Sequence, residues 1–266
     1  MTEEAFESQF ADVELEDYKD NAEFYELEER ARPDEMAMIH GAGMEALAIA
    51  RSRGKATVLD LCCGTGLSHE LLVNDPSISR IVGVDISEPY LEFARSAYAS
   101  AKTVPSYILG DVVTHPLPVV AWDIVMMCSA YHHIEDSRKV DFLKRVRGLI
   151  QHGGRGIFAE NILPAYSPGD TQQYSQSVRL FYESVLETAR KDNPALPEVV
   201  ERLIWRVAQY GFDGEYEYKV SYDIFQAHLN EAGLEVVKEQ KVWPSISNNL
   251  LGTGGNYVVV VKARDA

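Results

Sequence analysis

Acidic residues close successive short apolar runs in the first half of the chain, and a glycine-rich loop follows the first of these runs. The stretch VLDLCCGTGLS contains Asp60, Gly64 and Gly66, and the next two runs end at Asp85 and Asp111. Glycine lets a backbone approach a ligand closely, and a carboxylate can accept hydrogen bonds from a ribose diol or from an exocyclic amine. This spacing predicts a nucleoside site at the carboxyl ends of strands.

Three cysteines lie in these runs or close to them, so metal and thiol chemistry are alternatives. Cys62 and Cys63 are adjacent rather than spaced as a C-x-x-C pair, and no neighbouring pattern supplies the other ligands of a zinc site. Cys128 closes the apolar run WDIVMMC, where a buried hydrophobic role is commoner than a reactive one. We therefore expect no disulfide and no metal site, and a nucleophilic Cys128 stays a minor alternative.

The elements that position these residues follow from hydrophobic periodicity. Five short runs rich in apolar and β-branched residues alternate with helical patterns. The expected strands span 56–61, 80–85, 106–111, 122–127 and 154–160, and the helices between them span about 66–73, 87–101 and 136–151. Such runs separated by helices are typical of a parallel sheet covered on both faces.

Helical segments flank this alternation, and two further strands close the chain. Helices are expected over 13–31 and 34–53, then over 171–191, 197–210 and 221–232, and strands over 234–243 and 256–263. The resulting organisation is an N-terminal helical cap (1–54), a core of alternating strands and helices (55–163), a helical segment (164–218) and a C-terminal completion of the core sheet (219–266).

Composition limits the possible partners. The 266 residues, 46% of them hydrophobic, suffice for one sizeable core. The net charge is −16, and the first 35 residues contribute −11 of it through 14 acids and 3 bases, which leaves −5 for the rest. Because this balance repels phosphate backbones, we expect no nucleic-acid partner. No apolar run reaches the ~18 residues of a membrane span and the acidic opening is unlike a signal peptide, so a cytoplasmic protein without a membrane partner is expected.

Four motifs together suggest a family. In order and spacing, VLDLCCGTG, VGVDIS, LGDV and DIVMMCSAYHHIED resemble the motifs of class I S-adenosylmethionine-dependent methyltransferases over about residues 55–163. The resemblance implies an α/β fold with a Rossmann-like, seven-stranded, mostly parallel sheet and helices on both faces. It also implies S-adenosyl-L-methionine as the cofactor. The sequence departs from the family at Cys62, where glycine is common, and a Cβ there restricts how the loop turns.

The resemblance also implies which residues meet the cofactor. Residues 60–66 should wrap the methionine part, Asp85 should hold the ribose hydroxyls, and Ile86 should pack on the adenine. The expected cofactor-binding residues are Asp60, Cys62, Gly64, Gly66, Asp85, Ile86, Asp111, Val112 and Cys128, with Tyr18 and Tyr25 from the N-terminal helices as candidates for the cofactor's carboxylate. Packing of both tyrosines against the sheet is an equal alternative.

Histidines follow the fourth strand, where the resemblance places the methyl group. Methyl transfer requires positioning, and also removal of a proton when the nucleophile is a hydroxyl or an ammonium group. His133, followed by His132, is the candidate base, although either ring can instead hold the loop. The resemblance also implies that residues 55–163 form the cofactor-binding core and that residues 164–218 form a helical lid over the active site, whose aromatic residues should shape the acceptor pocket. The substrate-binding candidates are Tyr131, Tyr174, Arg179, Trp205, Trp243 and Asn248.

The function expected from the sequence is methyl transfer to a small-molecule acceptor. No Asp-Asn pair with the spacing of magnesium ligands follows the histidines, so a metal-dependent mechanism is disfavoured. A nicotinamide-dependent dehydrogenase and a protein that binds S-adenosylmethionine without transferring a methyl group are the alternatives. Composition and motifs leave the oligomeric state and the acceptor atom open.

Overall fold

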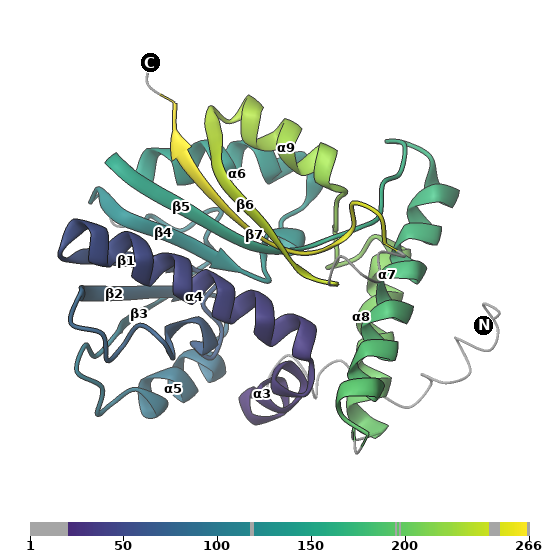
Figure 1. Cartoon of the computed structure of the whole chain (residues 1–266), viewed down its shortest axis with the longest axis horizontal. Helices are drawn as coiled ribbons and strands as arrows, with labels where there is room; N and C mark the ends of the chain where they lie inside the picture. Colours follow the sequence, from purple (N-terminus) through teal and green to yellow (C-terminus); the bar gives the residue numbers. More distant parts are fainter. Residues whose placement is uncertain (1–20, 118–119, 195, 197, 245–250, 265–266) are drawn as a thin grey trace.

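A seven-stranded sheet forms the centre of the computed structural model, which describes residues 21–117, 120–194, 196, 198–244 and 251–264 (Figure 1). The strand order is β3-β2-β1-β4-β5-β7-β6. Strands β1 to β5 run parallel, and β7 runs antiparallel to both β5 and β6. The strands are β1 (Ala56–Leu61), β2 (Ile78–Asp85), β3 (Ser106–Leu109), β4 (Trp122–Cys128), β5 (Ile150–Ile162), β6 (Leu234–Trp243) and β7 (Gly255–Ala263).

Helices cover both faces of the sheet, which explains why the central strands are apolar along nearly their whole length. On one face, α4 (Pro33–Arg53) packs on the strands through a buried row of small and apolar residues. On the other face, α6 (Asp136–Leu149) and α9 (Tyr222–Glu231) contribute aromatic and aliphatic side chains to a second core. The outer helix α5 (Glu88–Ala97) contacts β2 and β3. The expected mostly parallel sheet with two covered faces is confirmed.

Three helices gather at the carboxyl ends of the parallel strands. Helices α7 (Thr171–Asp192) and α8 (Glu198–Asp213) pack on each other around a third core and stand beside the sheet, close to the short helix α3 (Ala22–Ala31) (Figure 1). Among the described residues, no helix combines the length and the hydropathy that crossing a membrane requires. The two helical patterns in the predicted lid segment are confirmed as helices.

The helix expected over residues 66–73 is wrong. Only a single 3-10 turn, η1 (Leu67–His69), forms there, and successive turns continue the chain. The side chains of Ser68 and His69 both contact the Asp60 carboxylate beneath the loop, with His69 Nε2 3.0 Å from Asp60 Oδ2. These contacts favour tight turns over a helix, because the turns direct both side chains toward the buried Asp60 carboxylate. Outside this segment the expected elements form, although the expected helix 13–31 is described only from Ala22.

Candidate active site

The loop after β1 turns sharply because three of its residues adopt positive φ angles. Cys62 has φ 57°, Gly64 54° and Gly66 83°. The space beside Gly64 is open toward the cavity, since a Cβ there would meet nothing nearer than the Tyr25 hydroxyl at 3.7 Å. Gly66 instead packs tightly, and a Cβ there would lie 2.9 Å from the Tyr98 ring. The loop therefore offers bare backbone to the cavity at Gly64 and turns at Cys62 despite its side chain.

Asp85 is fixed at the end of β2 by two backbone donors. Gly64 N–H donates to its Oδ2 at 2.8 Å, and Ser87 N–H donates to its Oδ1 at 2.9 Å. Burial raises the pKa of Asp85 against the opposing effect of these hydrogen bonds. Each oxygen retains a lone pair, and the carboxylate lines the cavity. Beside it, the Ile86 side chain is 74% exposed and lines the same cavity.

Asp111 lies in the turn after β3, where hydrogen bonds from nearby residues also hold its carboxylate in place. It accepts hydrogen bonds from Val113 N–H and from the Thr114 hydroxyl, both at 2.8 Å. Although partial burial opposes ionisation, these hydrogen bonds lower the pKa of Asp111. Val112 is buried next to it, and both residues line the cavity. Acids at the ends of β2 and of the β3 turn thus face one space.

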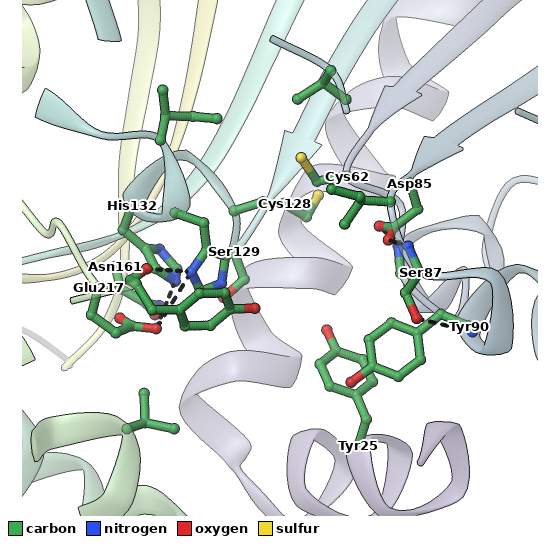
Figure 2. Close-up of a pocket in the computed structure, with 18 of the residues that line it drawn as sticks. Tyr25, Cys62, Asp85, Ser87, Tyr90, Cys128, Ser129, His132, Asn161 and Glu217 are labelled. Atoms are coloured by element: carbon green, nitrogen blue, oxygen red, sulfur yellow. Dashed lines mark hydrogen bonds and ion pairs between the residues drawn. The ribbon is translucent and has the colours of Figure 1, made fainter. Parts of the chain in front are cut away.

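That space is a cavity of about 600 Å³ at the carboxyl ends of the strands, within the size range of small-molecule sites (Figure 2). Tyr25 from α3 and Cys128 from β4 also line it. Three non-glycine residues have positive φ among the described residues, Cys62, Ser129 and Tyr216, and all three line this cavity. Such backbone strain, of about 1 kcal/mol or more each, is concentrated at functional sites.

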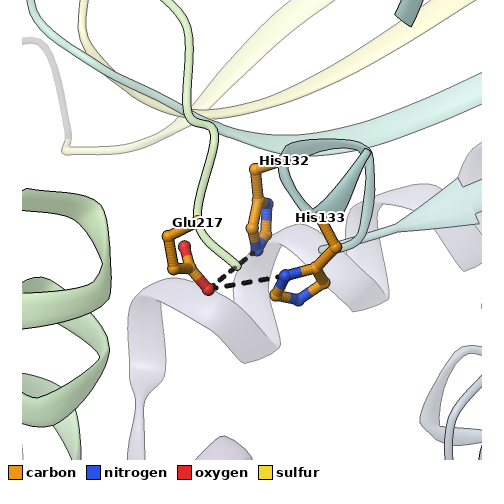
Figure 3. Close-up of side chains that lie close together, drawn as sticks. All are labelled: His132, His133 and Glu217. Carbon is orange, nitrogen blue, oxygen red and sulfur yellow. Dashed lines mark ion pairs between the residues drawn. The ribbon is translucent and has the colours of Figure 1, made fainter. Parts of the chain in front are cut away.

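Two histidines and a glutamate converge on the side of the cavity opposite Asp85 (Figures 2 and 3). Glu217 Oε1 lies 3.7 Å from His132 Nε2 and 3.6 Å from His133 Nδ1. The histidines come from the 3-10 turn η2 (Tyr131–His133) after β4, and Glu217 comes from the chain after α8. All three residues line the cavity.

Hydrogen bonds assign the ring protons of the two histidines. Glu160 accepts from Tyr131 N–H and Asn161 N–H, so it also accepts from His132 Nδ1–H, which leaves Nε2 unprotonated. His133 Nδ1 lies 3.0 Å from the Tyr216 carbonyl oxygen, which can only accept. His133 therefore carries its proton on Nδ1 and directs a lone pair on Nε2 away from that contact.

Buried charges keep the cluster in a defined protonation state. Burial alone would raise the pKa of Glu217, but chiefly the Lys219 ammonium group beside it holds it at about 2. Burial and Lys219 lower the pKa of His132 well below its ordinary value. Glu217 is thus a carboxylate and His132 a neutral imidazole near neutral pH.

Several residues expected at the substrate do not line the cavity. Tyr131, Trp205 and Trp243 are buried in the hydrophobic cores, because large apolar rings gain more from packing between helices than from facing a hydrated cavity. Tyr174 lines a separate smaller hollow, and the Arg179 guanidinium lies over the Phe212 ring. None of these five residues lines this cavity, and their substrate roles stay predictions.

Two expected cofactor residues lie behind the loop. Asp60 is buried beneath it and Gly66 faces the Tyr98 ring, so neither lines the cavity. Tyr18 and Asn248 lie outside the described residues. The remaining expected cofactor residues, Cys62, Gly64, Asp85, Ile86, Asp111, Val112, Cys128 and Tyr25, line the cavity together with His132 and His133.

Several polar residues that no sequence motif singled out reach the cavity from distant segments. They are Glu29, Arg32, Asn161, Glu217 and Lys219, with Glu160 buried behind His132. One signal was available for two of them. The stretch EYEYK, residues 215–219, alternates charged and aromatic residues, so an extended conformation brings Glu217 and Lys219 to one side.

The matching family model identifies the core. A methyltransferase domain model matches residues 58–154, which include the loop, Asp85, Asp111 and both histidines. This core is therefore similar to the methyltransferase domain that the model describes. An uncharacterized methyltransferase of Mycobacterium tuberculosis is 34% identical to this chain over 116 residues, which are 44% of this chain and 56% of that protein. The chain therefore spans about half the length of that curated relative.

Solved structures support the fold of this chain. An S-adenosylmethionine-dependent methyltransferase from Clostridium acetobutylicum is similar with a TM-score of 0.58 and 16% identity, over 89% of this chain and 94% of that one. The 4+2 cyclase SpnF is also similar, with a TM-score of 0.54 and 12% identity, over 84% of this chain and 81% of that one. At such identities the likeness concerns the fold alone, and the Rossmann-like expectation is confirmed.

Proposed function

We propose that this protein transfers a methyl group from S-adenosylmethionine to a small-molecule acceptor. One observation carries the proposal: the loop at Gly64, the acids Asp85 and Asp111, and the His132-His133-Glu217 cluster all face a single cavity. The proposed nucleoside site and the proposed proton-accepting group would thus share one space. The match of the core to a methyltransferase domain model supports the same activity.

The residues at one end of the cavity fit the cofactor. Asp85 is held by backbone N–H groups and keeps lone pairs for ribose hydroxyls, while exposed Ile86 offers an apolar surface for a base. Asp111 and Val112 would face the exocyclic amine, and Gly64 would face the methionine part. Cys62, Cys128 and Tyr25 complete this wall. When bound there, S-adenosylmethionine supplies a methyl group on a sulfonium, a good leaving group.

The chain's own chemical step would be removal of a proton from the acceptor. We assign this step to His133, whose Nδ1–H faces the Tyr216 carbonyl and Glu217, so that Nε2 is the basic nitrogen. The Glu217 carboxylate would stabilise the imidazolium formed when Nε2 takes the proton. His132 is the second candidate, but its burial against Glu160 favours a role in holding the loop.

The acceptor would lie between this cluster and the segment 164–218, which we propose acts as a lid. Tyr182, Val207, Tyr210 and Tyr216 line the cavity from this segment. Apolar and aromatic walls with a few polar groups are typical of sites for small organic ligands. They would also exclude water during the transfer.

The three side chains of the cluster could alternatively hold a metal ion, since their ligand atoms lie within 4.8 Å of one another. Two observations favour proton transfer instead. The Lys219 ammonium group already pairs with Glu217 Oε2, and a second cation on this carboxylate would be repelled. His133 Nδ1, the nitrogen that faces Glu217, carries the proton that Tyr216 accepts.

Ligand binding followed by mass spectrometry tests the proposal. S-adenosylhomocysteine should raise the melting temperature of the protein, whereas NAD should not. Incubation with S-adenosylmethionine and a panel of small metabolites should then give a product heavier by one methylene. Stabilisation by NAD alone would favour a dehydrogenase. Binding of S-adenosylhomocysteine without any methylated product would favour a role like that of the similar cyclase, which is not named as a methyltransferase.

A further inference from the structure

One face of α3 forms part of the cavity wall next to the glycine loop. Tyr25, Glu29 and Arg32 follow one another at helical spacing around the end of α3, and all three line the cavity. The first turns of α3 lie on the loop itself, because the Thr65 hydroxyl donates to Glu26 Oε1 at 2.7 Å and Tyr25 lies beside Gly64. Glu29 is one turn further along the helix. This face therefore covers the end of the cavity where the backbone is bare.

Glu29 differs from the acids around it because Arg32 makes no direct ion pair with it and lowers its pKa only through charge at longer range. Arg32 pairs with Glu28 at 3.0 Å, with Asp34 at 3.3 Å and with Glu35 at 3.0 Å. Glu29 is only 3% exposed, yet its Oε2 has no hydrogen-bond partner among the described residues. One guanidinium thus serves three carboxylates, and a fourth faces the cavity without a partner.

The charges around Glu29 increase this excess. The groups that interact with it electrostatically are Tyr25, Glu28 and Arg32 on α3 or at its end, Asp34 and Glu35 on α4, and Tyr90 on α5. Tyr182, Tyr210, Glu217 and Lys219 line other parts of the same cavity. Burial, together with Glu35 and Glu28, raises the pKa of Glu29 well above its ordinary value. An unpaired buried carboxylate is costly, and a ligand cation at this position would relieve that cost.

We propose that Glu29 binds a primary ammonium group, namely that of the amino-acid end of S-adenosylmethionine. The proposal rests on the proposed function, which places the methionine part against the loop at Gly64. Both terminal nitrogens of Arg32 are bonded to carboxylates, and its Nε–H has no partner among the described residues. Cofactor recognition at this end would therefore depend on an acid from the N-terminal cap.

A pair of ligands that differ in the amino-acid part isolates this contact. S-adenosylhomocysteine carries the ammonium group, and 5′-methylthioadenosine lacks the whole amino-acid part. Calorimetry on the full chain should show that Glu29→Gln lowers the affinity for S-adenosylhomocysteine by about 10- to 100-fold, as expected from the loss of one charge-assisted hydrogen bond. The affinity for 5′-methylthioadenosine should not change.

Glu28→Gln is the matched control. Glu28 is the adjacent buried carboxylate on the same helix, but it bonds Arg32 and does not line the cavity. This variant should melt at a lower temperature and yet keep the ratio of the two ligand affinities. Retained binding of 5′-methylthioadenosine by Glu29→Gln would show that this variant is folded.

Proton release gives a second measurement. Because the pKa of Glu29 is raised without ligand, pairing with an ammonium group should drive a proton from it into the buffer. The binding enthalpy of S-adenosylhomocysteine near neutral pH should then differ between phosphate and Tris for the wild type, and less for Glu29→Gln.

Two results would overturn the inference. One is equal affinity of wild type and Glu29→Gln for S-adenosylhomocysteine. This result would show that Glu29 does not bind the ammonium group of the cofactor, and an amine of the acceptor would be the remaining candidate ligand. The other is an equal loss for both ligands, which would make Glu29 a structural residue. Failure of the wild type to bind S-adenosylhomocysteine at all would instead contradict the proposed function.

Discussion

The two ends of the cavity are built in different ways. At the nucleoside end, each acid is fixed by donors within a few residues or on the adjacent loop, as Asp85 is by Ser87 and Gly64 and Asp111 by Val113. At the other end, His132 and His133 depend on Glu160, Tyr216 and Glu217 from remote parts of the chain. The first end is therefore a property of local turns, and the second is a property of how the lid segment meets the core.

Asp85→Ala should have the largest effect on the nucleoside end. Loss of two charge-assisted hydrogen bonds to the ribose should cost about 2 to 4 kcal/mol of cofactor binding. Calorimetry with S-adenosylhomocysteine measures this loss, and circular dichroism shows whether the fold persists. Asp141→Ala, at an exposed carboxylate of α6, is the control and should bind normally. An unchanged affinity of Asp85→Ala would contradict the nucleoside assignment.

His133→Ala should have the largest effect on turnover at the other end, with cofactor affinity preserved. Loss of a general base should lower turnover by about a hundredfold or more, and the pH-rate profile should lose its lower limb. His152→Ala, at an exposed histidine, is the control. A small rate loss with a lower melting temperature and an unchanged pH profile would instead show that the ring only holds the loop.

Glu217→Gln should lower turnover less than His133→Ala does. It tests whether this carboxylate from the segment 164–218 assists the proposed base His133. Without the carboxylate beside His133, the imidazolium form is less stable, so the lower limb of the pH-rate profile should move to lower pH and maximal turnover should fall by about tenfold. Glu215→Gln lies two residues away at an exposed position and should leave the profile unchanged. An unshifted limb in Glu217→Gln would separate Glu217 from the proton transfer.

Substitution of the lid wall should affect acceptor choice more than cofactor binding. Tyr210→Phe removes the hydroxyl of a residue that lines the cavity, so KM for the acceptor should change by a few fold while S-adenosylhomocysteine affinity stays constant. Tyr174→Phe, outside this cavity, is the matched control. A loss of cofactor affinity with KM unchanged would contradict the division of the cavity into two ends.

A chelator should have the smallest effect. If Lys219 rather than a metal ion neutralises Glu217, EDTA should leave turnover unchanged, and added divalent cations should not raise it. Metal analysis of the purified protein gives a second measurement. Turnover that EDTA abolishes and a divalent cation restores would show that the three side chains hold a metal ion.

The sequence alone determined the sheet and the nucleoside end. Apolar runs that end in an acid specify parallel strands whose carboxyl ends meet at one edge, and the motif around Gly64 follows β1 within a few residues. Tertiary structure decided the rest. The aromatic residues of the lid were expected at the substrate, yet Trp205 and Trp243 serve the cores because burial of large rings dominates their placement. Glu29, Glu160 and Glu217 come to lie at the cavity or directly behind its wall only through folding, since pairing between segments far apart leaves no periodic pattern in the chain.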